Sequence, residues 1–410
     1  MDSGDTAWML MSTALVMIML PGLALFYGGL VRRKNVLSTV MHSFFGLALV
    51  SIVWVVVGFT LAFGPDVTLP ILGAGWIGGL DFAMFNGVGQ APSAVYAVTI
   101  PFMLFAMFQL MFAAITPALI TGAFAERKRF GAFVLFTILW SILIYSPIAH
   151  WVWSVDGWLF ARGALDFAGG TVVHISSGVS ALVVALMIGR RHMNGDSKEP
   201  HDITMVVLGA GLLWFGWFGF NAGSAVTAGG LAASAFTVTN IAAAAATVTW
   251  VLASYAKTRK VSVVGAACGA VAGLVAITPA SGYVTPGGAL IIGLVAGGLC
   301  YSATLLRARS RVDDALDVFA VHGVGGMFGA VATGVFASTT VQAAYSGLLD
   351  GNPQQLVTQV VAVGATILYA AVGTVVIVKV VDLLLGIRVK PEVEEMGLDL
   401  SVHGEAAYQA

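Results

Sequence analysis

Charge is scarce in this chain. Only 10% of its 410 residues are charged and 59% are hydrophobic, whereas a soluble domain carries roughly 25% charged residues. The composition excludes a soluble globular fold and predicts an all-α, polytopic protein that lies in a lipid membrane. The net charge of -1 gives no basic surface, so we expect no nucleic-acid partner and no anionic-surface partner.

Cysteine is scarce too, and the common catalytic and metal-binding motifs are missing. Cys268 and Cys300 lie inside apolar segments, where we interpret them as packing residues. The chain has no CxxC or HxxxH spacing, no cofactor loop and no nucleophile motif, so we expect no metal, no cofactor and no enzymatic activity. A metal site would require both cysteines to converge on histidines. No basic residue precedes the first apolar run, so we expect either a mature N-terminus or a first helix that is itself the insertion signal.

Long apolar runs fill most of the sequence. Segments of about 20 residues are long enough to cross a bilayer, and short charged loops separate them. We predict eleven transmembrane helices, at about residues 6–30, 36–62, 95–124, 131–149, 167–189, 203–222, 231–255, 261–280, 286–306, 315–337 and 355–386.

The basic residues predict the orientation, because Lys and Arg collect on the cytoplasmic side. The eleven-helix arrangement places all but one of the 19 basic residues on one side, including Lys198; only Arg162 falls on the other. We therefore expect the N-terminus outside, the C-terminus inside and a location in the cell membrane.

Eleven helices divide naturally into five, five and one. The two halves, about 6–189 and 203–337, would then have inverted topology, followed by an extra helix at 355–386 and a cytoplasmic tail at 387–410. Inverted repeats place transport sites at their interface near the membrane midplane. The fifth helix of each half carries an Asp before a His, Asp166 before His174 and Asp317 before His322.

The two histidines are expected at similar depth. His174 follows Asp166 by eight residues and His322 follows Asp314 by eight, which places each about 12 Å into the membrane from opposite faces. If the halves pack face to face, the rings can touch. A buried neutral pair can hydrogen-bond donor to acceptor and pass a proton or guide a polar solute. The alternative is a buried His tied to a backbone carbonyl. The five other histidines are expected at the surface or at span ends: His42, His150, His192, His201 and His403.

Several long motifs resemble the ammonium transporter family (Amt/Mep/Rh), in particular its bacterial and archaeal Amt branch. They are "PGLALFYGGLVRRKN", "FAAITPALITGAFAER", "ALDFAGGTVVH", "FGWFGFNAGS" and "DVFAVHGVGG". The resemblance runs from the first helix to the tail. It implies the eleven-helix inverted repeat, a homotrimer with a pore in each protomer, and ammonium or methylammonium as substrate.

The resemblance also implies roles for individual residues. His174 and His322 would be the paired pore histidines, with Trp217 and Thr278 lining the pore beside them. Phe112 and Phe220 would be the stacked rings that close the entrance. Recruitment of ammonium would fall to Phe112, Ser224 and Trp153, with Trp151 as an alternative to Trp153. Read without the resemblance, each of these aromatics and Ser224 would be a helix-packing residue.

Asp166 has three possible roles. It can cap the fifth helix by accepting backbone N–H groups, hold a negative charge that attracts ammonium from beneath the entrance, or accept the proton. We interpret it as a capping and electrostatic acid, with Asp317 as its partial, structural counterpart.

The tail changes composition sharply. It is polar, and "GLDLSVHGEAAY" resembles the Amt cytoplasmic tail, which implies packing against neighbouring protomers and a face for a PII-type signal protein. The expected function is recruitment of ammonium, its deprotonation, and passage of ammonia along the histidines, with or without the proton. The alternatives are an ammonium sensor with the same fold and an Rh-type neutral gas channel.

Overall fold

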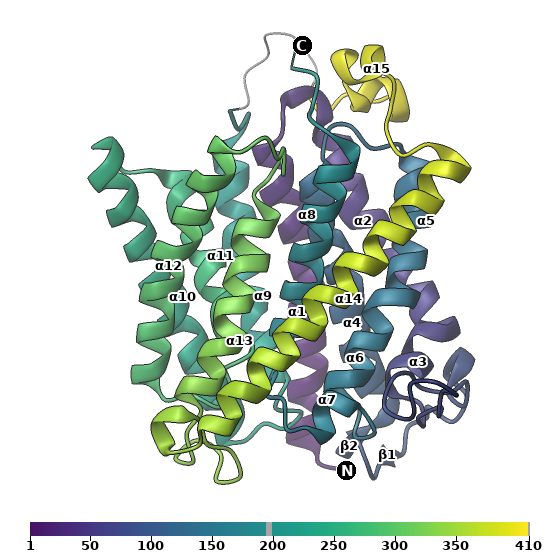
Figure 1. Ribbon diagram of the computed structural model, residues 1–410, viewed down its shortest axis with the longest axis vertical. Coiled ribbons are helices and arrows are strands. Elements are labelled where there is room, and N and C mark those ends of the chain that lie inside the picture. The colour runs from purple at the N-terminus through teal and green to yellow at the C-terminus, as the bar shows by residue number, and fades with distance from the viewer. Residues whose placement is uncertain (194–198, 409–410) are drawn as a thin grey trace.

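The computed structural model describes residues 1–193 and 199–408. It is a bundle of long helices whose two ends carry the loops, with the N-terminus at one end and the C-terminal segment at the other (Figure 1). Lys198, one of the basic residues used to predict the orientation, lies outside the described residues, as do the last two residues of the predicted tail.

The helices follow the predicted apolar runs, except that the predicted span at 95–124 becomes helical only at Phe102, because residues 97–101 form a strand. They are α1 (Ser3–Leu30), α2 (Val36–Val53), α3 (Phe59–Phe63), α4 (Phe102–Phe124), α5 (Phe130–Trp140), α6 (Ser146–Trp153), α7 (Trp158–Ala161), α8 (Ser176–Ile188), α9 (Ile203–Gly223), α10 (Gly230–Thr258), α11 (Val263–Ile277), α12 (Pro286–Arg309), α13 (Val324–Phe336), α14 (Pro353–Leu385) and α15 (Pro391–Met396). Two short strands, β1 (Pro92–Ser93) and β2 (Ala97–Pro101), pair antiparallel in the loop before α4.

Short turns of wider or tighter helix interrupt or join these elements. The π-helical turns are η2 (Trp54–Gly58), η4 (Ser141–Tyr145), η5 (Gly170–Ile175), η6 (Phe319–Gly323) and η8 (Asp399–His403). The 3₁₀ turns are η1 (Arg33–Asn35), η3 (Ala83–Phe85) and η7 (Leu348–Asp350).

The helices are long and apolar enough for a membrane protein. Within the described residues, ten stretches have the length and hydropathy needed to cross a bilayer, and α11 is a shorter apolar helix of 15 residues in the predicted eighth position. The expectation of an all-α polytopic fold is confirmed. The count of eleven spans and the orientation stay predictions.

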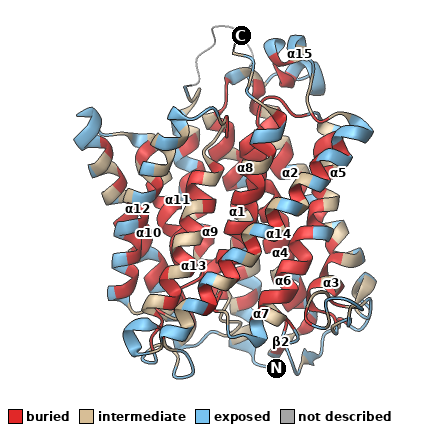
Figure 2. Ribbon diagram, in the orientation of Figure 1, coloured by how far each residue is buried: buried red, intermediate tan, exposed pale blue. Residues whose placement is uncertain are grey.

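The first helix of each predicted half packs along the other. α1 and α9 run side by side, and their backbones come so close that a Cβ added to Gly209 would lie 2.3 Å from the Phe26 nitrogen. Small residues permit such close approach between membrane helices. Buried residues concentrate in the interior of the bundle, while exposed ones follow its flanks and ends (Figure 2).

The fifth helices of the two predicted halves run in opposite directions. Arg127 donates to the carbonyl oxygens of Gly189, just after α8, and of Asp313, just before η6. α8 therefore ends at the level where η6 and α13 begin. This antiparallel arrangement brings the two histidine-bearing turns, η5 and η6, into contact.

Candidate functional site

Two buried histidines meet in the middle of the bundle. The Nδ1 atoms of His174 in η5 and His322 in η6 are 3.2 Å apart, and the side chains are 1% and 4% exposed. One Nδ1–H donates to the other Nδ1, so one ring presents Nε2 as an acceptor and the other presents Nε2–H as a donor. The structure thus brings together the two rings that the sequence predicts at one depth.

Both histidines lie on π-helical turns rather than on regular α-helix. Such turns are rare, and they occur frequently at functional sites. In each case the π-turn leads directly into the α-helix that follows, α8 or α13. The wider turn alters the direction of the side chains relative to that helix, which a helical repeat of 3.6 residues does not predict.

Asp166 organises the turn that carries His174. Its carboxylate accepts hydrogen bonds from the backbone N–H groups of Gly169 (2.7 Å), Gly170 (2.6 Å), Thr171 (2.8 Å) and Val172 (3.3 Å), and from the Thr171 hydroxyl. Every one of these donors stabilises the ionised form. The capping arrangement predicted for Asp166 is present, and no capacity is left over for direct contact with a ligand.

Asp314, not Asp317, is the counterpart of Asp166. Asp314 precedes His322 by the same eight residues, and its Oδ2 accepts from the Phe319 N–H at 2.8 Å in the turn η6. Asp317 instead forms a bidentate ion pair with Arg307, at 2.7 and 2.9 Å. Asp317, which we expected to be a partial and structural counterpart of Asp166, holds this ion pair, while Asp314, at the equal spacing noted in the sequence, accepts within the histidine-bearing turn.

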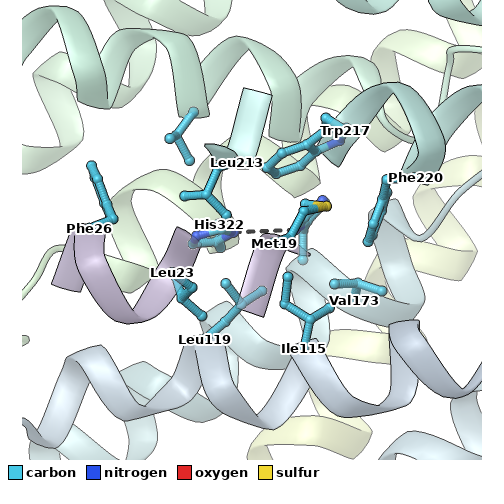
Figure 3. A pocket seen from close by; sticks show the side chains of 12 residues that line it. Met19, Leu23, Phe26, Ile115, Leu119, Val173, Leu213, Trp217, Phe220 and His322 are labelled. Carbon is cyan, nitrogen blue, oxygen red and sulfur yellow. Dashed lines mark hydrogen bonds between the residues drawn. The ribbon is translucent and has the colours of Figure 1, made fainter. Parts of the chain in front are cut away.

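The histidines border a narrow apolar hollow. Its lining includes Leu23, Ile115, Leu213 and Val173 with both histidines, Trp217 and Phe220. Figure 3 shows these side chains around His322, with the dashed hydrogen bond that joins the two imidazoles. We call this hollow the bore. Apart from the histidines its walls offer almost no polar group, so it suits a small neutral solute and strongly disfavours a bare cation.

Trp217 and Thr278 act together beside the bore. The Trp217 ring stacks against His174, with centroids 5.5 Å apart, and its Nε1–H donates to the Thr278 hydroxyl at 2.9 Å. Trp217 is among the residues that line the bore. Thr278 is not among the lining residues; it lies behind Trp217 and fixes the orientation of the indole.

Stacked aromatic rings close one end of the bore. Phe112 and Phe220 lie nearly parallel with ring centroids 4.1 Å apart, and both are buried. Phe112 also faces an open hollow that includes Trp153, Ser224, Phe160 and Gln109. We call this the vestibule. The ring pair therefore lies between the residues that line the vestibule and those that line the bore.

Trp153 rather than Trp151 faces the vestibule. The Trp153 ring meets Phe112 edge-on at 5.8 Å, and its Nε1–H donates to the Asp166 carbonyl. Trp151 is buried against Trp76 and donates its Nε1–H to the Trp76 carbonyl. The Ser224 hydroxyl donates to the Phe220 carbonyl at 2.8 Å, which leaves its lone pairs to accept from a ligand.

A second hollow opens at the opposite end of the bore. It shares Phe26, Val271 and His322 with the bore and widens past Cys268 to the Arg307–Asp317 ion pair. We call it the inner hollow. Sequence reasoning treated Cys268 as a packing residue and did not find this lining, because only the helix crossings bring it together. Phe112 lines the vestibule and Phe220 the bore, so the four features follow one another in the order vestibule, ring pair, bore and inner hollow.

Ion pairs fix the protein around this inner end. Arg191 joins Glu126 at 2.9 Å and Asp313 at 2.9 Å. Burial alone would raise the pKa of Asp313, but the hydrogen bonds and charge of Arg191 outweigh it and hold that pKa well below its usual value. The Asp313 carboxylate is thus ionised and anchors the segment that leads into η6.

Two other histidines differ from expectation. His42 and His150 were predicted at span boundaries, but both are buried. His42 packs against Phe133 with centroids 4.5 Å apart. His150 is bonded to the Ala62 carbonyl and to Asp66. Within the described part of the chain, no group of three or more His, Cys, Asp or Glu is placed to hold a metal ion.

The model of the Ammonium Transporter Family matches residues 7–408. An ammonium transporter of Bacillus subtilis is 52% identical over all of this chain and 99% of its own. The chain belongs to the ammonium transporter family. Another relative, ammonium transporter Amt1 of Archaeoglobus fulgidus, is 47% identical over the whole of both chains.

Solved structures of the family agree with this fold. Mep2 of Saccharomyces cerevisiae matches with a TM-score of 0.88 and 37% identity, over 96% of this chain and 88% of its own. A structure described as a sensor Amt protein matches with a TM-score of 0.87 and 30% identity, over 97% and 98%. The family is one of membrane transporters and not of enzymes, and this chain is a multi-pass protein of the cell membrane.

Proposed function

We propose that this protein transports ammonium by letting neutral ammonia, separated from its proton, pass through the bore. The observation that carries the proposal is the histidine pair, two buried imidazoles with Nδ1 atoms 3.2 Å apart inside an otherwise apolar passage. A cation that crossed this passage intact would lose its contacts with water and gain almost no polar contacts in return, which is very costly in free energy. Loss of the proton removes that cost.

Ammonium is recruited in the vestibule. The faces of Trp153 and Phe112 border this hollow, and each aromatic face attracts a partly desolvated cation by about 0.5–2 kcal/mol. Ser224 supplies an acceptor oxygen beside them. The ionised Asp166 lies below, and its negative charge favours a cation in the vestibule without touching it.

Entry to the bore requires the Phe112–Phe220 pair to open. The two rings are stacked at 4.1 Å and leave no passage between them, so one ring must rotate for each molecule that enters. The ammonium ion loses its proton beyond this boundary, where water and the Ser224 hydroxyl give way to apolar walls, and the histidine pair takes up that proton.

The histidines guide ammonia and carry the proton. The neutral pair offers Nε2 as an acceptor on one ring and Nε2–H as a donor on the other, so a proton taken up at one ring can leave from the other after both tautomers exchange. Ammonia and proton recombine in the inner hollow, which contains the Asp317 carboxylate.

Currents on a supported membrane test the proton path. The double variant His174→Leu/His322→Leu keeps an apolar bore of similar volume and removes both imidazoles. We expect an ammonium pulse to evoke a current with the unchanged protein and none with the double variant. The variant Thr340→Val changes an exposed loop hydroxyl and controls for losses during purification and reconstitution. An undiminished current in the double variant would remove the histidine relay.

A second function is favoured by one comparison. The similarity to the sensor Amt structure, at 30% identity over nearly the whole chain, makes an ammonium sensor the alternative. Uptake by cells that lack their own ammonium permeases, with methylammonium as competitor, distinguishes the two. A transporter restores growth on low ammonium, whereas a sensor binds ammonium without supporting uptake.

We also propose that the protein works as a homotrimer and that a PII-type signal protein docks on its cytoplasmic face. The tail lies at this face, where the Tyr408 hydroxyl contacts His201 at 3.3 Å, beside Pro200 at the rim of the inner hollow. A pull-down with the PII protein, using the full chain and a chain lacking 387–410, tests the role of the tail. Equal capture by both would count against it.

A further inference from the structure

A buried glutamine lies on α14, the long apolar helix outside the two predicted halves. Gln359 is 1% exposed, although glutamine is mostly exposed in folded proteins. The helix runs obliquely across the bundle (Figure 1) and packs against α8, α13 and the turn η5. An amide buried in a stretch that is apolar and long enough to cross a membrane is costly unless it is hydrogen-bonded, so its partners indicate what it does.

The amide of Gln359 bonds to the backbone of Leu165 on both sides. Its Oε1 accepts from the Leu165 N–H at 2.7 Å, and its Nε2 donates to the Leu165 carbonyl at 2.8 Å. Gln355, one turn earlier on α14, donates to the same Oε1 at 3.3 Å. The side-chain amide thus exchanges two hydrogen bonds with Leu165 as a residue of a neighbouring strand would. It fixes the peptide units before and after Leu165.

The same amide reaches the segment that carries the other histidine. Its Nε2 also donates to the Ala330 carbonyl at 2.9 Å. Ala330 lies on α13, which directly follows the turn of His322. Only one orientation of the amide satisfies these partners, because two carbonyls require the NH₂ group and one N–H requires the oxygen. Gln359 therefore joins the segment before η5 to the helix after η6.

Leu165 directly precedes the residue on which two parts of the site depend. The Asp166 carboxylate gathers the N–H groups of the turn that carries His174. The Asp166 carbonyl accepts from the Trp153 Nε1–H at 2.9 Å, and Trp153 lines the vestibule. Because Leu165 and Asp166 share a peptide unit, a shift of Leu165 moves Asp166, and with it the indole and the turn.

We propose that Gln359 is a positioning residue for transport. It clamps residues 165 and 166 to α13, and through that segment it positions the Trp153 indole and the turn that carries His174. Its effect on transport rests on the proposed function, whereas its effect on the segment does not. The clamp gives α14 a part in the site, although no residue of α14 lines the vestibule, the bore or the inner hollow as far as the structure describes them.

Kinetics of ammonium uptake by the reconstituted protein test the proposal. Gln359→Leu keeps a side chain of similar size and removes every hydrogen bond of the amide. We expect its KM to rise about tenfold or more, because the recruiting indole and the acid below it lose their fixed position. A partly unfolded preparation would lower Vmax and leave KM unchanged, so KM separates positioning from loss of folded protein.

Hydrogen exchange gives a readout that does not depend on transport. Exchange through residues 165–172 should accelerate in Gln359→Leu. Thr366→Val is the matched control, because it removes a buried hydroxyl of α14 that donates to the Ala362 carbonyl of the same helix; it should leave KM and exchange unchanged. If the unchanged protein took up no ammonium, the proposed function would fail, while exchange would still test the clamp.

The conservative variant Gln359→Glu supplies a rescue. A protonated carboxyl accepts from the Leu165 N–H and donates to the Leu165 carbonyl, whereas the ionised form has no donor. KM should therefore approach that of the unchanged protein at low pH and rise relative to it as the carboxyl ionises. This rescue decides the matter if Gln359→Leu does not fold.

Three results would overturn the proposal. They are an unchanged KM in folded Gln359→Leu, unaltered exchange through residues 165–172 in that variant, and a KM of Gln359→Glu at low pH that is no closer to normal than that of Gln359→Leu. A loss of thermal stability in Gln359→Leu with normal KM would likewise show that the amide serves folding alone.

Discussion

Asp166 and Asp314 precede their histidines at the same spacing, but they differ in how well their carboxylates are satisfied. Asp166 accepts five hydrogen bonds. Asp314 accepts from the Phe319 N–H, and its Oδ1 is buried without a partner among the described residues. Burial and the nearby charge of Asp317 raise the pKa of Asp314 to about 6. Asp314 therefore changes protonation near physiological pH.

Asp314→Asn should stabilise the protein increasingly as pH rises from 3.8 to about 6, and fully above that range. The folded state binds the proton of Asp314 more tightly than the unfolded state does. The free energy of unfolding therefore falls as pH rises from 3.8, the ordinary pKa of an aspartate, to about 6, the pKa of Asp314 in the folded protein. The amide removes this penalty of about 3 kcal/mol, and its oxygen still accepts from Phe319. Thermal unfolding in detergent at pH 4.5 and 7.5 measures it. The exposed Asp81→Asn is the control, and a gain of equal size at both pH values would contradict the argument.

The importance of a single residue could be predicted where a polar side chain stands in an otherwise apolar segment of the sequence. His174 and His322 stand out because an ionisable group in a membrane span requires a reason. The supporting role of Thr278 was not predictable, because a hydroxyl in such a helix usually bonds to its own backbone, and only the meeting of α9 with α11 brings it to Trp217. His42 and His150 were misplaced for a similar reason: their burial depends on neighbouring helices.

At the scale of helices, the crossing of the two histidine-bearing segments depends on the absence of side chains. A Cβ added to Gly178 on α8 would lie 2.2 Å from the backbone nitrogen of Gly323 on η6. That contact is backbone against backbone, so neither partner can move aside. The separation between His174 and His322 is consequently set by Gly178 as much as by the histidines.

Gly178→Ala should abolish the crossing. Since the added methyl group meets a backbone atom, we expect a loss of stability beyond the 1–3 kcal/mol usual for overpacking, with little monodisperse protein in detergent and no ammonium uptake. Gly364→Ala on α14 is the matched control, because its added Cβ meets nothing within 4 Å; it should leave yield and uptake unchanged. Normal yield of Gly178→Ala would show that the helices can separate.

The helices themselves were largely predictable, but their local geometry was not. Apolar length alone identifies a span, so the predicted ranges follow the observed ones from α1 to α14. The π-helical turns η5 and η6 cannot be deduced from periodicity, because they depend on a carboxylate that collects several backbone N–H groups at once. The predicted span at 261–280 corresponds to the shorter α11, which ends before the buried turn that follows Ile277.

At the scale of the whole molecule, the C-terminal segment fastens the inner ends of helices that are distant in sequence. The Asp399 carboxylate accepts from the N–H groups of Leu37 and Ser38 at the start of α2, at 3.0 and 2.9 Å. Glu394 accepts from the His192 N–H and pairs with Arg388. The resemblance implied contacts with neighbouring protomers; within one chain the tail already packs against its own helices.

Asp399→Ala should release the tail. Loss of the carboxylate leaves the first-turn N–H groups of α2 without a partner, at a cost of about 1 kcal/mol, and frees η8. Hydrogen exchange should accelerate at Leu37, at Ser38 and through residues 397–408, while the bore stays protected. Glu405→Ala, at an exposed side chain, should exchange like the unchanged protein. Unaltered exchange in Asp399→Ala would mean that other contacts hold the tail.

The bond between Asp399 and α2 also bears on biogenesis. The two partners are separated by more than 360 residues, so the ribosome makes the amides of α2 early and their carboxylate almost last. Until translation nears its end, the first turn of α2 lacks this carboxylate. A truncated nascent chain would keep that turn uncapped, so the last residues to be made complete the hydrogen bonding of one of the first helices.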